Sequence, residues 1–521
     1  MRRSGNFFII LALFIAGSAT LQAQTFPTDD PIVKNIWAEA VDSSKLEVLA
    51  HELLDVIGPR LVGSPQMLKA NDWAVKKLGS WDIEARSEQY GTWEGWERGI
   101  THIDLLEPRV RTLEGTMLAW SPGTKKGGVT ARTILLADVE DSVAFLKWLP
   151  NVKGKFVLLS QPQPTGRPDK NWEEFGIKAS FDSLKALRDR LKENWDARIK
   201  STGFASDTLP DIFAQAGAVG VITSRWSMGW GVNKIFGTKS RTIPVVDISL
   251  EDYNLVFRLT EYGDNPLLRI DAQSKSLGRM PANNTIGMIR GTEKPEEYIV
   301  LSAHFDSWDA GSGATDNGTG SILMMETMRI LKKHYPNPKR TIIIGLWGSE
   351  EQGLNGSRAF VKDHPEIVEN VHAVFNQDNG TGRVTSIGIQ GFVNAGESLA
   401  HWLSRVPGEV TTHIKVDFPG MPWGGGSDHA SFVAAGVPAF SLGSLNWDYF
   451  LYTWHTNRDT YDKLVFDDLK NNAVLTACLV YMASEQPEMV SREKRVMPIN
   501  RRTGEPREWP QPRDPNREGG D

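Results

Sequence analysis

The sequence predicts an α/β protein with a mixed, largely parallel sheet that helices cover on both faces. From residue 270 onward, short apolar segments typical of strands alternate with segments of helical periodicity, which is the order found in sheets of this class. Acidic or imidazole side chains follow three of the strands, and ligands of such sheets bind at strand carboxyl ends. The four predicted strands are residues 298–303, 341–347, 371–377 and 438–442.

The chain is too long for one ordinary domain. It has 521 residues, of which 40% are hydrophobic and 23% charged, the balance of a globular protein. We expect a signal peptide over residues 1–23, an N-terminal part of the main domain over 24–118, an inserted domain over 119–280, the main domain over 281–487 and a tail over 488–521.

The first 23 residues are predicted to be an export signal. Arg2 and Arg3 form a basic start, residues 7–16 are almost wholly apolar, and small residues lead to Ala23. The apolar run is shorter than the ~20 residues that span a bilayer, so no membrane anchor is expected after the signal is removed. An uncleaved anchor is the alternative. We therefore expect a periplasmic or secreted protein.

Cysteine content and charge restrict the classes of protein further. Cys478 is the single cysteine, so no intrachain disulfide can form and stability has to come from core burial. The formal net charge is −6, and nothing in the composition indicates a nucleic-acid partner.

Outside the sheet, helices are predicted over residues 44–56 and 66–78, and over 320–334, where Ile322 and Met325 recur at helical spacing. The tail, rich in Arg, Pro and Glu, is expected to be mobile or to form a strap over the surface.

The inserted domain is predicted to be β-rich and to carry a charged helical insertion over residues 171–200. A Gly/Ser/Asn-bearing connection over 272–284 is expected to lead into the main domain. The predicted strands of the inserted domain are residues 133–138, 155–160 and 219–223.

His304 and Asp306 follow the first strand of the main domain in the order His-Phe-Asp. A metal-bound imidazole needs an acceptor for its second ring nitrogen, and a nearby carboxylate can supply one. Ten residues further on, Asp316 begins the next helix, either as a helix cap or as a carboxylate that bridges two cations.

Glu350 and Glu351 follow the strand 341–347 as adjacent anions. Such a pair repels unless a positive charge compensates, although two solvated glutamates in a turn are the alternative. A metal that binds one carboxylate and leaves the other beside a bound water supplies both the compensation and a general base.

Asp378 follows the strand 371–377, where a turn cap is the alternative role, and His455 follows a glycine-rich and aromatic stretch. A doubly wound sheet gathers strand-end residues at one edge, so scattered caps explain the whole set poorly. Imidazole and carboxylate ligands without thiolate suit zinc, with Co²⁺ or Mn²⁺ as substitutes. Five such residues, one of them bridging, predict two zinc ions per chain.

In order and spacing, these motifs resemble the two-zinc exopeptidase family of secreted zinc aminopeptidases and plasma glutamate carboxypeptidase, also called carboxypeptidase Q. Residues 304–309, 347–353 and 58–64 are similar to the carboxypeptidase Q branch, and the likeness covers most of the chain after the signal. The residues that carry it are His304, Asp316, Glu350, Glu351, Asp378 and His455.

The resemblance implies a zinc exopeptidase fold in which Asp316 bridges the two zinc ions. It implies that Glu351 and His455 complete one metal site, and that His304 and Asp378 complete the other.

The resemblance also implies that Glu350 is the general base, that Asp306 orients His304, and that a cis peptide bond precedes Asn317. Some family members place an oxyanion-stabilising tyrosine directly before the last histidine, where this chain has Trp454. The donor could instead be Trp454 itself, Tyr449 or Tyr452.

The inserted domain resembles the protease-associated domain of this family, which would shape access to the cleft. Residues 424–429 resemble a loop near the substrate, so Ser427, Asp428 and His429 are candidate pocket residues, with helix capping as the alternative for Ser427 and Asp428.

The expected activity is removal of N-terminal residues from peptides or cleavage of dipeptides. A carboxypeptidase or dipeptidase of the carboxypeptidase Q type is the close alternative, because spacing alone does not identify the residues that bind a free terminus. A non-catalytic binding protein and a glutaminyl cyclase are remote alternatives, since no ligand is missing. Related enzymes often dimerise, so a homodimer is an open alternative.

Overall fold

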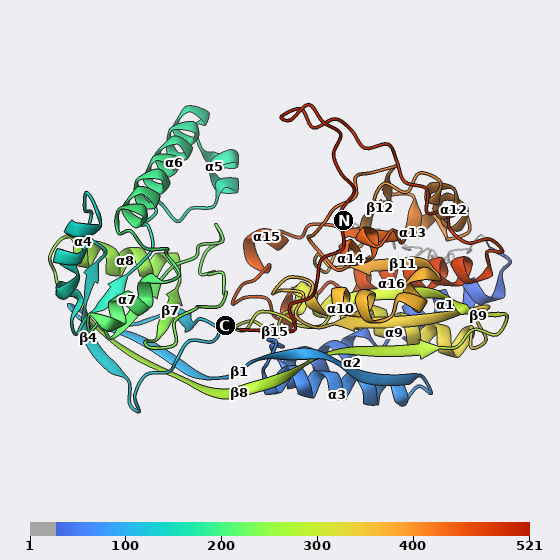
Figure 1. Ribbon diagram of the computed structural model, residues 1–521, viewed down its shortest axis with the longest axis horizontal. Coiled ribbons are helices and arrows are strands. Elements are labelled where there is room, and N and C mark those ends of the chain that lie inside the picture. Colours follow the sequence, from blue (N-terminus) through green and yellow to red (C-terminus); the bar gives the residue numbers. More distant parts are fainter. Residues whose placement is uncertain (1–27, 521) are drawn as a thin grey trace, which may run out of the picture.

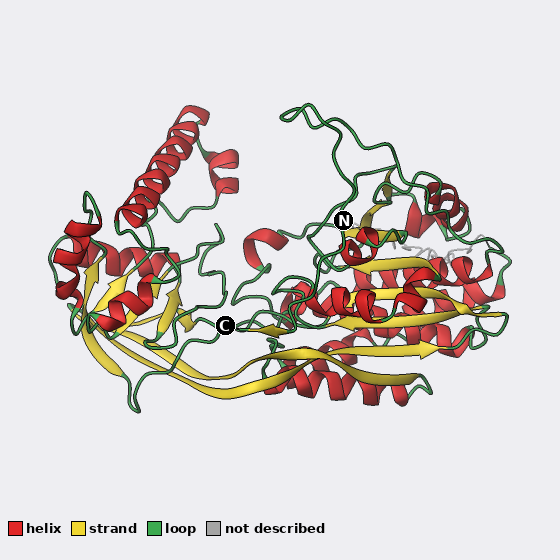
Figure 2. Cartoon of the chain, viewed as in Figure 1, coloured by secondary structure: helices red, strands yellow, loops and turns green. Residues whose placement is uncertain are grey.

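The computed structural model describes residues 28–520, and the predicted export signal lies outside the described residues. The chain forms a larger and a smaller lobe joined by two long antiparallel strands, β1 (Glu84–Glu107) and β8 (Leu267–Ile289) (Figures 1 and 2). Both strands run through both lobes, so the division between the lobes falls inside paired strands and not in a flexible linker.

The larger lobe contains the predicted α/β sheet, flanked by helices. Its strand order is β13-β12-β14-β11-β9-β10-β8, in which β14, β11, β9 and β10 are mutually parallel. At the two ends of this order, β8 runs antiparallel to β10, and β12 runs antiparallel to β14 but parallel to β13. The strands are β9 (Lys294–His304), β10 (Arg340–Trp347), β11 (Val371–Gln377), β12 (Val384–Gly388), β13 (Lys415–Asp417) and β14 (Ala439–Ser444). The four strands predicted for this sheet are thereby confirmed.

One continuous apolar core holds this lobe together. The central strands β10 and β11 are buried along their whole length, and α9 (Thr319–His334) is buried from Thr319 to Leu331 between the sheet and α16 (Phe466–Glu485). The other helical segments of the lobe are α1 (Pro31–Asp42), α2 (Leu46–Ala50), η1 (His51–Ile57), α3 (Pro65–Gly79), η3 (Ala314–Gly318), α10 (Asn355–Asp363), α11 (Pro365–Glu369), α12 (Ala395–Leu403), α13 (Gly408–Thr411), α14 (His429–Ala434), α15 (Tyr449–Tyr452) and η4 (Tyr461–Lys463).

The smaller lobe is less purely β than its sequence predicts, because helices accompany a short parallel sheet in the order β4-β5-β6-β7. The charged insertion is helical as predicted, and it projects from this lobe (Figure 1). Its C-terminal end is attached to the lobe through Arg198, which donates to the Leu136 carbonyl oxygen and pairs with Asp138. The elements are β2 (Arg111–Leu113), β3 (Gly115–Met117), β4 (Val129–Leu135), α4 (Ser142–Trp148), η2 (Leu149–Val152), β5 (Phe156–Leu158), α5 (Asp169–Phe175), α6 (Lys178–Ser201), α7 (Leu209–Gln215), β6 (Gly220–Thr223), β7 (Val245–Ile248) and α8 (Leu250–Glu261).

The connection predicted over residues 272–284 is wrong, because these residues form the middle of strand β8, opposite β1. The C-terminal residues form a strap over the surface that ends in β15 (Glu518–Gly519), paired with Thr92 and Trp93 of β1. Among the described helices, none is both long and apolar enough to cross a membrane.

Candidate active site

Parallel packing of three strands brings the predicted site residues to one edge of the sheet. His304 is the last residue of β9 and stands in register with Trp347, the last residue of β10. Glu350 and Glu351 lie in the loop that begins after β10, and Asp378 directly follows β11, which pairs with the other side of β9. The carboxyl ends of three adjacent strands therefore supply four of the predicted side chains, as the sequence pattern predicts.

Loops supply the remaining two residues. Asp316 lies in η3, immediately before α9, and His455 lies three residues after α15. The alternative role of Asp316 as a helix cap is not what the structure shows, since it is the Asn317 side chain that accepts the Gly320 N–H, at 3.0 Å. The peptide bond between Asp316 and Asn317 is cis.

Asp316 lies between two groups of side chains, and each of its carboxylate oxygens faces one group. Its Oδ1 lies 3.4 Å from His304 Nε2, which is 2.9 Å from Asp378 Oδ1. Its Oδ2 lies 3.3 Å from His455 Nε2, which is 2.8 Å from Glu351 Oε2. Each group, with Asp316 in common, is compact enough to hold one metal ion.

The donor set fits two divalent cations. Asp316 Oδ2, Glu351 Oε1 and His455 Nδ1 are buried without a hydrogen-bond partner among the described residues. None of the site carboxylates has an ion pair with a described lysine or arginine. Buried anions without a compensating charge are costly, so the arrangement calls for bound cations, and its nitrogen and oxygen donors suit zinc.

The pKa values of the site residues also indicate that a positive charge is missing from the protein alone. Burial, together with the negative charges of neighbouring carboxylates, raises the pKa values of Glu350 and Glu351 well above the ordinary range. Burial acts in the opposite direction on His304, but the charges of Asp378 and Glu350 outweigh it and raise the His304 pKa. Positive charge is thus favoured at the centre of the site.

Asp306 holds the loop that carries the two glutamates. Its carboxylate oxygens accept the backbone N–H groups of Glu350 at 3.0 Å and Glu351 at 3.3 Å. His304 Nδ1 lies 3.0 Å from the Asp306 carbonyl oxygen and 3.7 Å from the carboxylate. The acceptor nearest the imidazole is therefore the main chain of Asp306, while its side chain positions the loop after β10.

Two positioning residues were not predicted. Asp459 accepts backbone N–H groups from the loop before Asp316, and the guanidinium of Arg60 donates to the carbonyl oxygens of Phe305 and Gly313 at 2.7 and 2.9 Å. Arg60 lies in the segment 58–64 that carries part of the resemblance. The partners of both residues are backbone groups of distant loops, and side-chain patterns contain no signal for such contacts.

Three aromatic residues are candidate oxyanion donors. Tyr449 is buried, and burial together with the negative charge of Asp316 raises the pKa of its phenol well above the ordinary range. The ring of Trp454 instead stacks on His455 with the ring centroids 4.0 Å apart. Tyr452 is half-buried beside Gly229 of the smaller lobe. Of the three, Tyr449 is the one whose phenol is close enough to the proposed metal ligands for their charges to raise its pKa.

The loop before α14 contributes to a polar cavity of about 510 Å³ beside Asp378. Ser427 and His429 line this cavity, and Ser427 Oγ accepts a hydrogen bond from Asn376 at 2.9 Å. Asp428 is fully buried, and burial raises its pKa to about 7. Neither Ser427 nor Asp428 caps α14 with its side chain, which leaves the pocket interpretation for Ser427 and His429.

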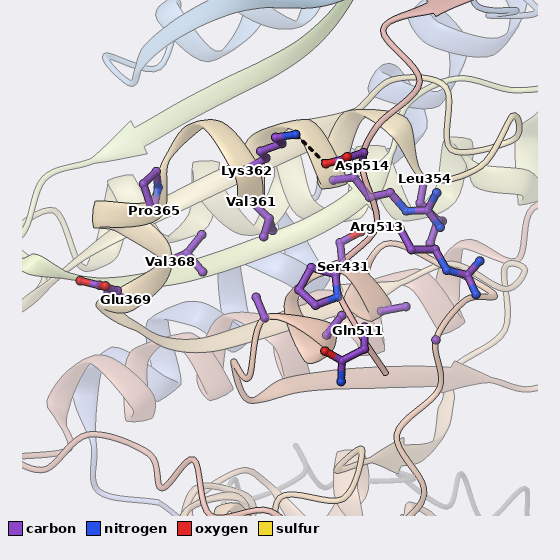
Figure 3. A pocket seen from close by; sticks show the side chains of 16 residues that line it. Leu354, Val361, Lys362, Pro365, Val368, Glu369, Ser431, Gln511, Arg513 and Asp514 are labelled. Carbon is purple, nitrogen blue, oxygen red and sulfur yellow. Dashed lines mark hydrogen bonds and ion pairs between the residues drawn. The ribbon is translucent and has the colours of Figure 1, made fainter. Parts of the chain in front are cut away.

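A second cavity, of about 340 Å³, lies between α10, α14 and the C-terminal strap (Figure 3). Lys362 of α10 forms an ion pair with Asp514 of the strap at its edge, with 2.5 Å between the charged atoms. No predicted metal ligand is among the residues that line it. This cavity is therefore separate from the candidate active site.

Known proteins similar to this chain are peptidases, which agrees with the arrangement of the site residues. Residues 284–480 match the model of Peptidase family M28. Carboxypeptidase Q of Mus musculus is 25% identical over 440 residues, which cover 84% of this chain and 86% of that protein.

Two solved structures share the fold. A Peptidase M28 precursor from Shewanella amazonensis SB2B superposes with a TM-score of 0.63 at 24% identity, over 88% of this chain and 97% of the other. The zinc aminopeptidase BSAP from Bacillus subtilis gives a TM-score of 0.54 at 18% identity, over 86% of this chain and 96% of the other.

Fold, site and comparisons together define a metallo-exopeptidase. Residues 284–480 are similar to Peptidase family M28, which agrees with the resemblance to zinc exopeptidases that the motifs predicted.

Proposed function

We propose that this protein is a two-zinc exopeptidase that cleaves short peptides, and that Glu350 is its general base. The observation that supports this most is the position of Asp316, whose two oxygens face two separate groups of ligands. His304 and Asp378 would hold one zinc ion, Glu351 and His455 the other, and Asp316 both. Bound zinc would supply Lewis-acid chemistry at the scissile carbonyl and favour deprotonation of water.

The protein residues have distinct roles in this proposal. Glu350 takes a proton from the attacking water and returns it to the leaving amine, a task that suits a carboxylate directly next to the proposed ligand Glu351. Asp306 positions Glu350 by binding its backbone N–H. The phenol of Tyr449 donates to the developing oxyanion, which assigns the donor that sequence alone left open.

The smaller lobe is proposed to be a protease-associated domain that limits access to the site. The Ile235 N–H donates to the His455 carbonyl oxygen at 2.7 Å, so this lobe reaches the rim of the metal site. The proposed substrates are therefore short, and the proposed place of action is outside the cytoplasm, following the N-terminal sequence.

Replacing Glu350 tests the chemical proposal. General-base catalysis contributes about 10²–10⁴-fold. Glu350→Gln should therefore lower kcat by about 100-fold or more, while its zinc content stays at the wild-type level. Glu409→Gln, at an exposed position of α13, is the matched control and should keep full activity. Full activity of Glu350→Gln on dipeptides would remove Glu350 from the mechanism.

A further inference from the structure

Lys234 belongs to the smaller lobe but is held beside the metal site by main-chain contacts. It forms a bridge with Thr456, next to His455, and its neighbour Ile235 donates to the His455 carbonyl oxygen. On its other side, the Asn233 carbonyl oxygen accepts the Asn457 backbone N–H, and the Asn233 backbone N–H donates to Asn457 Oδ1. The position of the Lys234 backbone relative to His455 is thus fixed from both directions.

The buried Asn233 in turn is tied to the sheet of the smaller lobe. Its Nδ2 donates to Asp247 Oδ1 at 3.0 Å, and Asp247 also accepts from Thr223 and from the Arg225 backbone. Asp247 is fully buried at the end of β7. These hydrogen bonds therefore fix the segment that carries Lys234 to the sheet of the smaller lobe.

The Lys234 ammonium group lies 3.9 Å from the centroid of the Trp454 ring, which itself stacks on His455. Lys234 is half-buried, and among the described residues no carboxylate lies within ion-pair distance of its nitrogen and no acceptor binds it. Burial lowers the Lys234 pKa to about 8, against the opposing effect of the Asp316 charge.

A half-buried cation held over an aromatic ring without a counter-ion is poised for an anionic ligand. The negative charge that acts on Lys234 within the protein is that of Asp316, and cations bound by Asp316 would cancel this attraction. A substrate amine would be repelled at this position. A carboxylate would be attracted, and a peptide has one at its C-terminus.

The two sides of the metal site present different groups to a substrate. On the side of Asp378 lies the polar cavity lined by Ser427 and His429, whereas Lys234 lies on the side of His455. A dipeptide whose scissile carbonyl lies at the metal site has its first residue on one side and its α-carboxylate on the other.

We propose that Lys234 binds the free α-carboxylate of the residue that follows the scissile bond and is thereby a specificity-determining residue of the site. This inference rests on the proposed function and adds the terminus that the enzyme recognises. Trp454 is the platform that positions the ammonium group, which gives a role to the aromatic residue in the place of the family's tyrosine.

The test compares one dipeptide with its C-terminal amide, using the purified full chain loaded with zinc. Wild type should prefer the free acid by about 10- to 100-fold in kcat/KM, the value of one charge-assisted contact. Lys234→Met should lose this preference, mainly through a higher KM for the acid, and should change the amide reaction less than about 3-fold. Lys234→Arg should restore most of the preference.

Arg225→Met is the matched control, because Arg225 is an exposed cation on the same segment, over the ring of Phe236. It should keep the preference for the acid. Equal cleavage of acid and amide by wild type, an equal loss on both substrates in Lys234→Met, or loss of the preference in Arg225→Met overturns the inference and leaves the proposed peptidase function intact. Wild type that cleaves neither substrate contradicts the proposed function itself.

Discussion

Asp459 accepts the backbone N–H of Asp316 at 3.0 Å and that of Thr315 at 2.8 Å, so one carboxylate fixes the loop that carries the shared metal ligand. Asp459 lies four residues after His455 in the sequence. A single segment therefore supplies one proposed ligand directly and positions another through its main chain.

Asp459→Asn should weaken zinc binding. An amide offers one acceptor oxygen where the loop presents two N–H groups, so the position of Asp316 becomes less restricted. Loss of such a supporting contact lowers metal affinity by about 10- to 100-fold, which competition with a chelator measures. The control is Asp462→Asn, at an exposed position nearby, and unchanged affinity in Asp459→Asn would contradict this role.

Arg60→Met should destabilise the whole larger lobe. Arg60 is fully buried, and its guanidinium donates to the carbonyl oxygens of Gly58, Phe305, Ser312 and Gly313. Removing these donors leaves buried acceptors unpaired, at a cost of about 3 kcal/mol in the free energy of unfolding. Urea denaturation measures it, and a loss below about 1 kcal/mol would show that water replaces the guanidinium without difficulty.

Glu39 should contribute stability that disappears in acid. Burial alone would raise its pKa, but hydrogen bonds from Lys333, Arg329 and His334 lower it to about 2, from 4.5. The contribution is therefore complete above pH 4.5 and is lost as the pH falls towards 2.

The matching variant is Glu39→Gln. It should be about 2 kcal/mol less stable than wild type at pH 7, because solvent around the partly exposed Lys333 weakens its ion pair with Glu39. Denaturation measured across a series of pH values should show this difference shrinking below pH 4.5. A difference that stays constant down to pH 2.5 would mean that the ion pairs of Glu39 do not stabilise the fold.

Much of the site was predictable because strand-end positions are set by local sequence. His304, Glu350, Glu351 and Asp378 each follow an apolar run that forms a strand, and parallel pairing then brings their side chains together. Zinc follows from the kinds of donor. The position of His455 was inferred from its place in the motif order.

The rest depended on contacts that sequence spacing does not contain. Residues 272–284 have the composition of a connection, yet they form part of a strand, because pairing with β1 outweighs a weak local preference. Arg60 and Asp459 bind main-chain groups of distant loops, and Lys234 reaches the site from the other lobe. All three act through tertiary contacts.

The C-terminal strap should stay bound after it is cut. Residues 501–508 are exposed, whereas Trp509 packs on Phe392 with the ring centroids 5.1 Å apart, Lys362 pairs with Asp514 (Figure 3), and β15 pairs with β1. Brief trypsin treatment should cleave after Arg501 or Arg502, and the C-terminal fragment should co-elute with the protein in size-exclusion chromatography. Separation of the fragment without denaturant would show that these contacts are too weak to anchor the strap.

The central claim is that Asp316 serves two metal sites at once. The zinc content of the protein tests this claim most directly. Atomic absorption on the dialysed wild-type protein should give about two zinc ions per chain. Asp378→Asn should lower the content to about one, and Asp316→Asn should lose tight binding at both sites. One zinc ion in wild type, or two retained by Asp316→Asn, would contradict the account.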